Sequence, residues 1–126
     1  MKILIVDDSL FTLNYHKELI EKAGLTPLLA DSGEKALALY KAENPEIVLC
    51  DIMMPEMNGY EVFELLKEIS SDVFLYFISA EMTTGAKQKA ISMKAAGFYQ
   101  KPISAKEISE ILEHYRKKAF SKKSKA

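Results

Sequence analysis

Residues 3–9 read ILIVDDS, four apolar residues that lead directly into two adjacent aspartates, Asp7 and Asp8. The apolar run is short, continuous and rich in β-branched residues, which is typical of a strand buried on both faces of a sheet. Two acids at the end of such a strand either face solvent in a turn or serve a site that needs a cation. The rest of the sequence has to discriminate between these two interpretations.

Further apolar runs follow, and helical patterns separate them. Strands are also predicted at 26–30, 46–50 and 73–79, with a weaker one at 98–101. Residues at spacings of three and four predict helices at 9–23, 33–43, 59–69, 84–96 and 104–118. This spacing places Tyr15 and His16 on the inner stripe of the first helix and Ile91 on that of the fourth. Ser104 and Glu107 have the spacing of a capping box at the start of the last helix. Five β-α units in succession predict an α/β fold, a parallel sheet with helices on both faces.

The composition is that of one globular domain. The chain has 126 residues, of which 48% are hydrophobic and 28% charged, and its net charge of −1 does not favour nucleic acid or membrane surfaces as partners. The segment 116–126 carries six basic residues and no acid, so residues 1–115 carry −7. We find no signal-peptide pattern and no apolar run long enough to cross a membrane. The single cysteine, Cys50, cannot form an internal disulfide and fits a reducing compartment.

The residues that end the predicted strands are informative, because ligands of parallel sheets bind beyond the carboxyl ends of the strands. Asp51 ends the third strand, Ser79 ends the fourth and Lys101 ends the fifth. Together with the aspartates after the first strand, they place three acids, a hydroxyl and an amine at one edge of the sheet. This common position favours a cation site over a solvated turn.

Four blocks of the sequence resemble the signature blocks of response-regulator receiver domains, the phospho-accepting half of two-component signalling. The blocks are IVDDS (5–9), VLCDIMMPEMNGYEV (48–62), FISAE (77–81) and QKPI (100–103). The resemblance covers about residues 2–118. It implies a flavodoxin-like doubly wound sheet of five parallel strands in the order 2-1-3-4-5, with five helices.

The resemblance also implies roles for the acids. Asp51 matches the phosphoryl acceptor, Asp8 matches the acid that contacts Mg²⁺ directly, and Asp7 matches its partner, which acts through water. The backbone carbonyl of Met53 would be a further metal ligand. The chemistry is consistent, because Mg²⁺ prefers oxygen ligands and cancels the repulsion among crowded carboxylates.

The other strand ends match residues that respond to the phosphoryl group. Ser79 would bind it, Lys101 would pair with it, and the peptide between Lys101 and Pro102 is often cis in this family. Phe98 falls at the aromatic switch position, where tyrosine is common. Movement of Ser79 toward the phosphoryl group would vacate space into which the aromatic side chain can swing.

The function implied is that of a phospho-accepting regulator. A sensor histidine kinase or phosphotransfer protein would transfer a phosphoryl group to Asp51 in a Mg²⁺-dependent reaction. The face formed by the fourth helix, fifth strand and fifth helix, marked by Lys87, Lys94, Tyr99 and Lys106, would then control a protein partner. We expect a cytoplasmic protein that is monomeric when unphosphorylated, without direct contact to nucleic acid or membrane, and leave open dimerisation of the phosphorylated form. Self-phosphorylation from phosphodonors and autodephosphorylation are the only reactions expected, so the protein is not an enzyme in the ordinary sense.

Alternatives remain at this point. We expect a receiver domain over 1–118 and a basic, disordered tail over 119–126, with a receiver cut from a larger multidomain regulator as the alternative. A Mg²⁺-dependent phosphohydrolase with an aspartate nucleophile is disfavoured, because that class wants a second acid two residues after the nucleophile, where this chain has Met53. His16 and His114 lack ligand-like spacing and are interpreted as structural.

Overall fold

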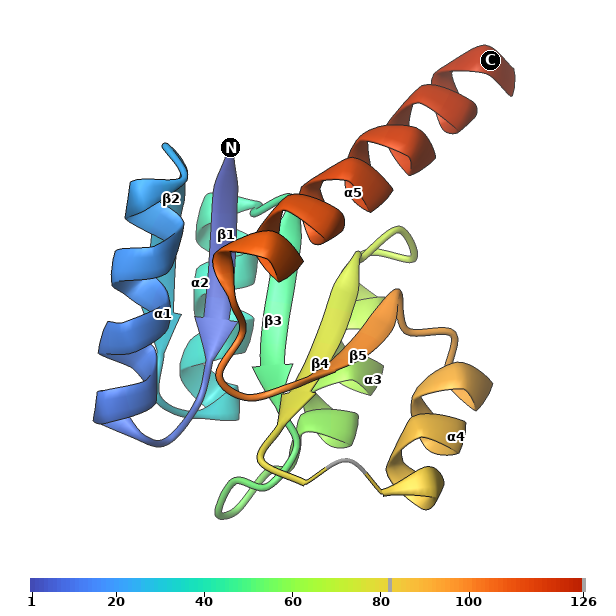
Figure 1. Ribbon diagram of the computed structural model, residues 1–126. Coiled ribbons are helices and arrows are strands. Elements are labelled where there is room, and N and C mark those ends of the chain that lie inside the picture. Colours follow the sequence, from blue (N-terminus) through green and yellow to red (C-terminus); the bar gives the residue numbers. More distant parts are fainter. Residues whose placement is uncertain (82, 126) are drawn as a thin grey trace.

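The computed structural model describes residues 1–81 and 83–125, and of 122–125 only the helical backbone. Within this part of the chain, five strands alternate with five helices (Figure 1). The strands are β1 (Lys2–Val6), β2 (Thr26–Ala30), β3 (Ile47–Asp51), β4 (Leu75–Ser79) and β5 (Gly97–Gln100). The helices are α1 (Leu10–Lys22), α2 (Gly33–Glu43), α3 (Gly59–Ile69), α4 (Thr84–Ser92) and α5 (Ala105–Lys125).

The strands form one parallel sheet in the order β2-β1-β3-β4-β5, which confirms the predicted fold. The chain places β2 on one side of β1 and the later strands on the other side, beginning with β3. The carboxyl ends of β1 and β3 lie side by side, because Val6 pairs with Cys50. On the other side of β3, Asp51 pairs with Ile78, and Ser79 pairs with Gln100 of β5. The register therefore brings the ends of four strands to one crevice, the usual ligand position in such sheets.

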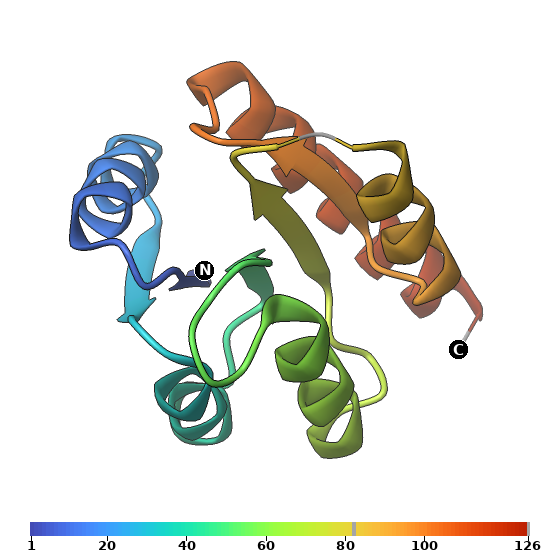
Figure 2. The same ribbon diagram turned by 90° about the horizontal axis from the view of Figure 1, so that it is seen from below.

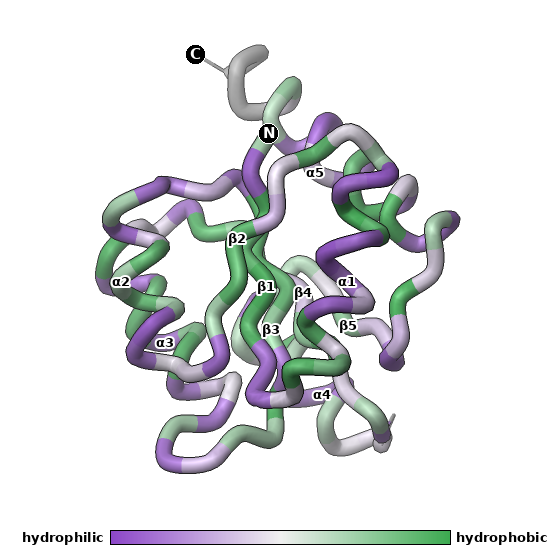
Figure 3. Tube along the Cα trace, turned by 90° about the vertical axis from the view of Figure 1, so that its left-hand side faces the viewer, coloured by the Kyte–Doolittle hydropathy of each residue, from purple (hydrophilic) through white to green (hydrophobic). Residues whose placement is uncertain are grey.

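Helices cover both faces of the sheet (Figure 2). On one face α1 and α5 enclose a core that includes Leu13, Ile20 and Ile111. On the other face α2, α3 and α4 enclose a core that includes Phe63 and Phe77. Figure 3 shows the apolar character concentrated along the strands between the helices. Among the described residues, no helix has both the length and the apolar character needed to cross a bilayer.

Polar side chains fix where the helices begin. Ser9, Ser32 and Thr83 each accept a hydrogen bond from the third residue of the helix that follows. Asn58 and Glu61 form a reciprocal capping box at the start of α3, the helix that follows the end of β3. The capping box predicted at the start of α5 is also present, since Ser104 and Glu107 each accept from the other's backbone N–H, at 3.2 and 2.9 Å.

Three local expectations differ from the structure. The buried stripe of α1 is Leu13, His16 and Ile20, whereas Tyr15, predicted to lie inside, is 44% exposed. Helix α4 ends at Ser92 rather than at residue 96, and Ile91 is 75% exposed. Helix α5 continues to Lys125, through most of the segment expected as a disordered tail, and its C-terminal end projects beyond the sheet (Figure 1). The division of the chain into a domain and a tail remains a prediction.

Candidate functional site

The residues predicted to form the site line one cavity of about 370 Å³ at the carboxyl edge of the sheet. They come from the ends of β1, β3, β4 and β5, and are joined by the residues that follow these strands. The lining consists of Asp7, Asp8, Ser9, Asp51, Met53, Ser79, Ala80, Glu81 and Lys101. Convergence of side chains so distant in sequence follows from the parallel register described above.

Three carboxylates form a compact cluster in this cavity. Asp7, Asp8 and Asp51 each offer an oxygen atom, and these atoms all lie within 4.8 Å of one another. Asp7 and Asp51 are buried and Asp8 is exposed, so the cluster faces solvent on one side. Hard oxygen donors with access to water are what Mg²⁺ requires, because this ion usually retains some of its waters. The donor set therefore fits a magnesium ion.

Lys101 neutralises part of this negative charge. Its Nζ donates to Asp7 Oδ2 at 2.9 Å and lies 3.3 Å from Asp51 Oδ2. Burial alone would lower the pKa of Lys101, but the hydrogen bond to Asp7 and the charges of both carboxylates raise it above its ordinary value. The ammonium group is thus held in its charged form beside the two buried acids.

The two carboxylate oxygens of Asp51 have different partners. Oδ1 accepts a hydrogen bond from the backbone N–H of Ile52 at 2.8 Å, while Oδ2 is the atom nearest Lys101. Burial, and then the charge of Asp7, raises the pKa of the Asp51 carboxyl, although Lys101 opposes both effects. A second cation in the cavity would shift the group back toward its charged, nucleophilic form.

Gly59 packs against the end of β3, a contact that the sequence interpretation missed. A Cβ atom at this position would lie 2.2 Å from the Asp51 carbonyl oxygen and 2.9 Å from Ile52 Cα. The Gly59 N–H also donates to the Ile52 carbonyl at 2.8 Å. The start of α3 therefore packs directly against the backbone of Asp51. The Asn-Gly pair at 58–59, eight residues beyond the acid, was the only available signal.

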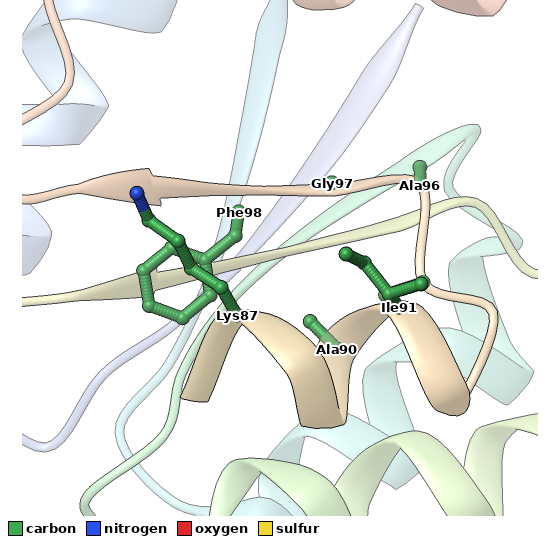
Figure 4. Close-up of a pocket in the computed structure, with 7 residues that line it drawn as sticks. Lys87, Ala90, Ile91, Ala96, Gly97 and Phe98 are labelled. Carbon is green, nitrogen blue, oxygen red and sulfur yellow. The ribbon is translucent and has the colours of Figure 1, made fainter. Parts of the chain in front are cut away.

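Ser79 ends β4 and lines the cavity, whereas Phe98 of the neighbouring strand β5 does not. Ser79 is buried, and its Oγ accepts from the Glu81 backbone N–H at 3.2 Å, which leaves its own proton available to another acceptor. Phe98 pairs with Phe77 in the sheet and is half-buried. It lines a separate cavity of about 360 Å³ between α4 and β5, together with Lys87 and Ile91 (Figure 4).

The remaining predicted residues lie at the rim or behind it. Met53 lines the cavity and is 77% exposed. The Lys101–Pro102 peptide is cis, as the resemblance implied. His16 is buried and does not line the cavity. His114 does not line it either, and its ring contacts the Tyr76 hydroxyl. Neither histidine belongs to the acidic cluster found in the described part of the chain.

Comparisons with known proteins point in one direction. A family model described as the response regulator receiver domain matches residues 3–113. The chemotaxis protein CheY of Thermotoga maritima is 33% identical over 117 residues, which cover 92% of this chain and 98% of that protein. A chain of the CheX–CheY–BeF3–Mg²⁺ complex from Borrelia burgdorferi superposes with a TM-score of 0.82 at 28% identity, covering 89% of this chain and 86% of that one.

Longer relatives match as well. The transcriptional regulatory protein YvrH of Bacillus subtilis is 30% identical over 122 residues, which cover 96% of this chain but 51% of that protein. The chain spans about half the length of this and of other curated transcriptional regulators that it matches.

Proposed function

The chain belongs to the response regulator receiver domain family, and from this premise we propose that Asp51 accepts a phosphoryl group from a sensor histidine kinase or a phosphotransfer protein. The observation that carries the proposal is the buried Asp51 carboxylate, flanked by Lys101 and by the carboxylates of Asp7 and Asp8. Lys101 places a positive charge beside a nucleophilic oxygen, and the three carboxylates offer ligands for a cation, which together would stabilise the charge of a phosphoryl group during transfer.

In the proposed reaction, Asp51 Oδ2 forms a bond to phosphorus while the bond to the leaving group of the donor breaks. The product is an acyl phosphate on Asp51. Asp7, Asp8, Asp51 and the backbone carbonyl of Met53 would hold Mg²⁺. When bound, this ion supplies positive charge to the phosphoryl oxygens and to the crowded carboxylates. Lys101 exchanges its contact with Asp51 for one with the phosphoryl group, because that group carries the larger charge.

The proposed switch begins at Ser79. Its hydroxyl donates to a phosphoryl oxygen, which draws the loop after β4 toward Asp51. Phe98 then moves into the vacated space, and the population of conformations of the α4–β5–α5 face shifts. The cavity lined by Phe98 and Ile91 shows that β5 and α4 are not tightly packed here, which is consistent with such a movement (Figure 4).

Two surfaces are proposed to meet partners. Phe11 and Tyr15 on α1 line an apolar pocket together with Lys101 and Pro102, next to the acceptor site, and this surface would meet the phosphodonor protein. The α4–β5–α5 face, marked by Lys87 and Tyr99, would bind the downstream protein. The Borrelia burgdorferi complex, described with CheX, BeF3 and Mg²⁺, supports both a magnesium site and a protein partner for this chain.

The finer organisation belongs to the same proposal. We place the receiver unit at 1–118 and the basic segment at 119–126, in a cytoplasmic protein that is monomeric when unphosphorylated. Receiver domains are not enzymes in the ordinary sense, and self-phosphorylation and autodephosphorylation are the reactions we expect. The chain matches about half the length of some transcriptional regulators. This supports the alternative proposal of a receiver unit that works inside a larger regulator.

Intact mass after incubation with acetyl phosphate tests the proposal. Wild-type protein should gain one phosphoryl group with Mg²⁺ and none without it, and Asp51→Asn should gain none in either condition. Asp31→Asn is the matched control, because Asp31 forms an ion pair with Lys35 outside the cavity and its loss should change nothing. Failure of the wild type to gain mass, together with failure to bind beryllofluoride, would refute phosphoryl acceptance.

A further inference from the structure

His16 makes a specific long-range hydrogen bond that neither its sequence context nor the proposed mechanism explains. The side chain lies on the inner side of α1 and is fully buried. Its Nε2 atom accepts from the backbone N–H of Ile103 at 3.1 Å, across 87 residues of sequence. Nδ1 makes no hydrogen bond of normal geometry within the described residues. The ring is therefore anchored through Nε2 to the loop between β5 and α5.

That loop carries Lys101. On one side of the lysine, its own backbone N–H donates to the Ser79 carbonyl at 2.8 Å. On the other side, Pro102 has no N–H to donate, so the next backbone donor is Ile103, and this donor is bonded to His16. The lysine backbone is thus fixed between β4 and α1, and from there its side chain reaches Asp7 and Asp51.

The chemistry of the ring suits this role. To accept from Ile103, Nε2 must keep its lone pair, so the neutral ring carries its proton on Nδ1. Burial lowers the pKa of His16, and this effect outweighs the Asp7 charge and the Thr12 carbonyl, which favour the charged ring. An apolar side chain of similar volume would fill the same space but would leave a buried N–H without a partner, which is costly.

We propose that His16 is a positioning residue for phosphoryl acceptance, a role that rests on the proposed function of Asp51. It fixes the loop that presents Lys101 and thereby sets the rate at which the acceptor reacts. It also links this loop to α1, whose exposed Tyr15 packs edge-on against the His16 ring and lines a pocket with Lys101. A partner that shifts α1 would therefore shift the lysine as well.

A double-mutant cycle tests this assignment. The initial rate of phosphorylation by acetyl phosphate with Mg²⁺ is measured for wild type, His16→Leu, Lys101→Ala and the double variant. We expect His16→Leu to be about tenfold slower, because a small misplacement of a charged group is costly in phosphoryl transfer. If His16 acts through Lys101, the same substitution should change the rate by less than about twofold in the Lys101→Ala background. His16→Gln, which retains an acceptor, should recover most of the rate.

Ile20→Ala is the matched control, since Ile20 is fully buried on the same face of α1. It should lose stability but react within about twofold of wild type below its melting temperature. Because His16→Leu can fail to fold, a second measurement uses the wild type: scalar coupling across the hydrogen bond between the Ile103 amide nitrogen and His16 Nε2, detected by NMR.

The outcomes separate the two proposals. Absence of the coupling, an equal loss in both backgrounds, or Gln and Leu variants that are equally slow would overturn the role of His16 and leave Asp51 as the acceptor. A wild type that neither gains a phosphoryl group nor binds beryllofluoride would overturn the proposed function and, with it, the role of His16.

Discussion

Strands β3 and β5 each deliver a charged group to the same cavity, but they hold it in different ways. All five residues of β3 are buried, and the strand lies in the middle of the sheet with Asp51 as its last residue. Strand β5 lies at the edge, is half-buried at Gly97–Tyr99 and exposed at Gln100, and ends one residue before Lys101. Asp51 is held by the core, and Lys101 is held by individual hydrogen bonds.

The difference shows which of the two groups can move. Displacing Asp51 would disturb the packing of β1, β3 and β4 together with the Gly59 contact, whereas displacing Lys101 breaks a few bonds, each worth about 0.5–1.5 kcal/mol or somewhat more where charged. In the proposed switch, a signal that begins at Asp51 would therefore be carried outward by β5 and the loop that follows it.

Gly59→Ala should have the largest effect, because it disturbs the backbone of the buried strand β3 at Asp51. The new methyl group would lie 2.2 Å from the Asp51 carbonyl oxygen, and a backbone atom in a central strand cannot rotate away. We expect a loss of about 3 kcal/mol in the free energy of unfolding, measured by urea denaturation, and strongly reduced phosphorylation. A loss below about 1 kcal/mol would show that the end of β3 is more adaptable than its burial indicates.

Lys101→Met should come next, because it leaves the two buried carboxylates of Asp7 and Asp51 without their cation. We expect a loss of about 2 kcal/mol without divalent ions at neutral pH. Mg²⁺ should stabilise this variant more than it stabilises wild type, because the ion would replace the missing charge. Thermal melts with and without Mg²⁺ measure the difference, and equal stabilisation of both proteins would contradict a shared role for lysine and metal.

Gly97→Ala is the matched test on the edge strand. Its Cβ would lie 2.5 Å from a ring atom of Tyr76, which is a side chain and can shift. The Tyr76 ring stacks on Tyr99 and its hydroxyl contacts His114, so a shift of the ring would weaken both contacts. We expect a loss of about 1 kcal/mol in the same urea measurement. A cost equal to that of Gly59→Ala would remove the contrast between the two strands.

Much of this contrast follows from sequence pattern. Continuous apolar runs predicted β1, β3 and β4, and the residues that end them predicted which side chains share the cavity. The His16–Ile103 bond could not be predicted, because spacing along a helix reports the buried face and not the partner across 87 residues. Tyr15 was placed on the inner stripe of the first helix because of its spacing, yet the buried stripe of α1 is Leu13, His16 and Ile20, and Tyr15 is 44% exposed. The roles of Asp51, Ser79 and Lys101 stay predictions.

A smaller effect concerns pH. The pKa of Asp51 in the folded protein lies above its ordinary value of 3.8, chiefly because of burial. Between the two values the folded state binds more protons than the unfolded state, so this group's contribution to stability falls as pH rises through the folded pKa. Asp51→Asn removes the carboxyl group and, with it, this decrease in stability at higher pH. Without divalent ions, the stability of the variant relative to wild type should increase as pH rises from about 3.8, and a constant difference would refute the sign.

Met53→Asn should have the smallest effect. Met53 is exposed at the rim and offers no group that could orient a water molecule. An amide at this position can do so, and we expect the phosphorylated protein to lose its phosphoryl group about threefold faster. Decay of the phosphorylated mass after removal of the donor measures the rate. An unchanged lifetime would show that the thioether at the rim does not limit access of water.

The length of α5 matters for movements that begin at the edge strand β5 and the loop after it. A helix of 21 residues is about 31 Å long, and this one begins at Ala105, directly after the loop that His16 and Ser79 hold. A rigid-body tilt of this helix would have its pivot next to the loop that carries Lys101. A tilt of about 10° at that pivot would carry the far end through about 5 Å, so a subångström adjustment at Lys101 is magnified where the helix leaves the body of the protein.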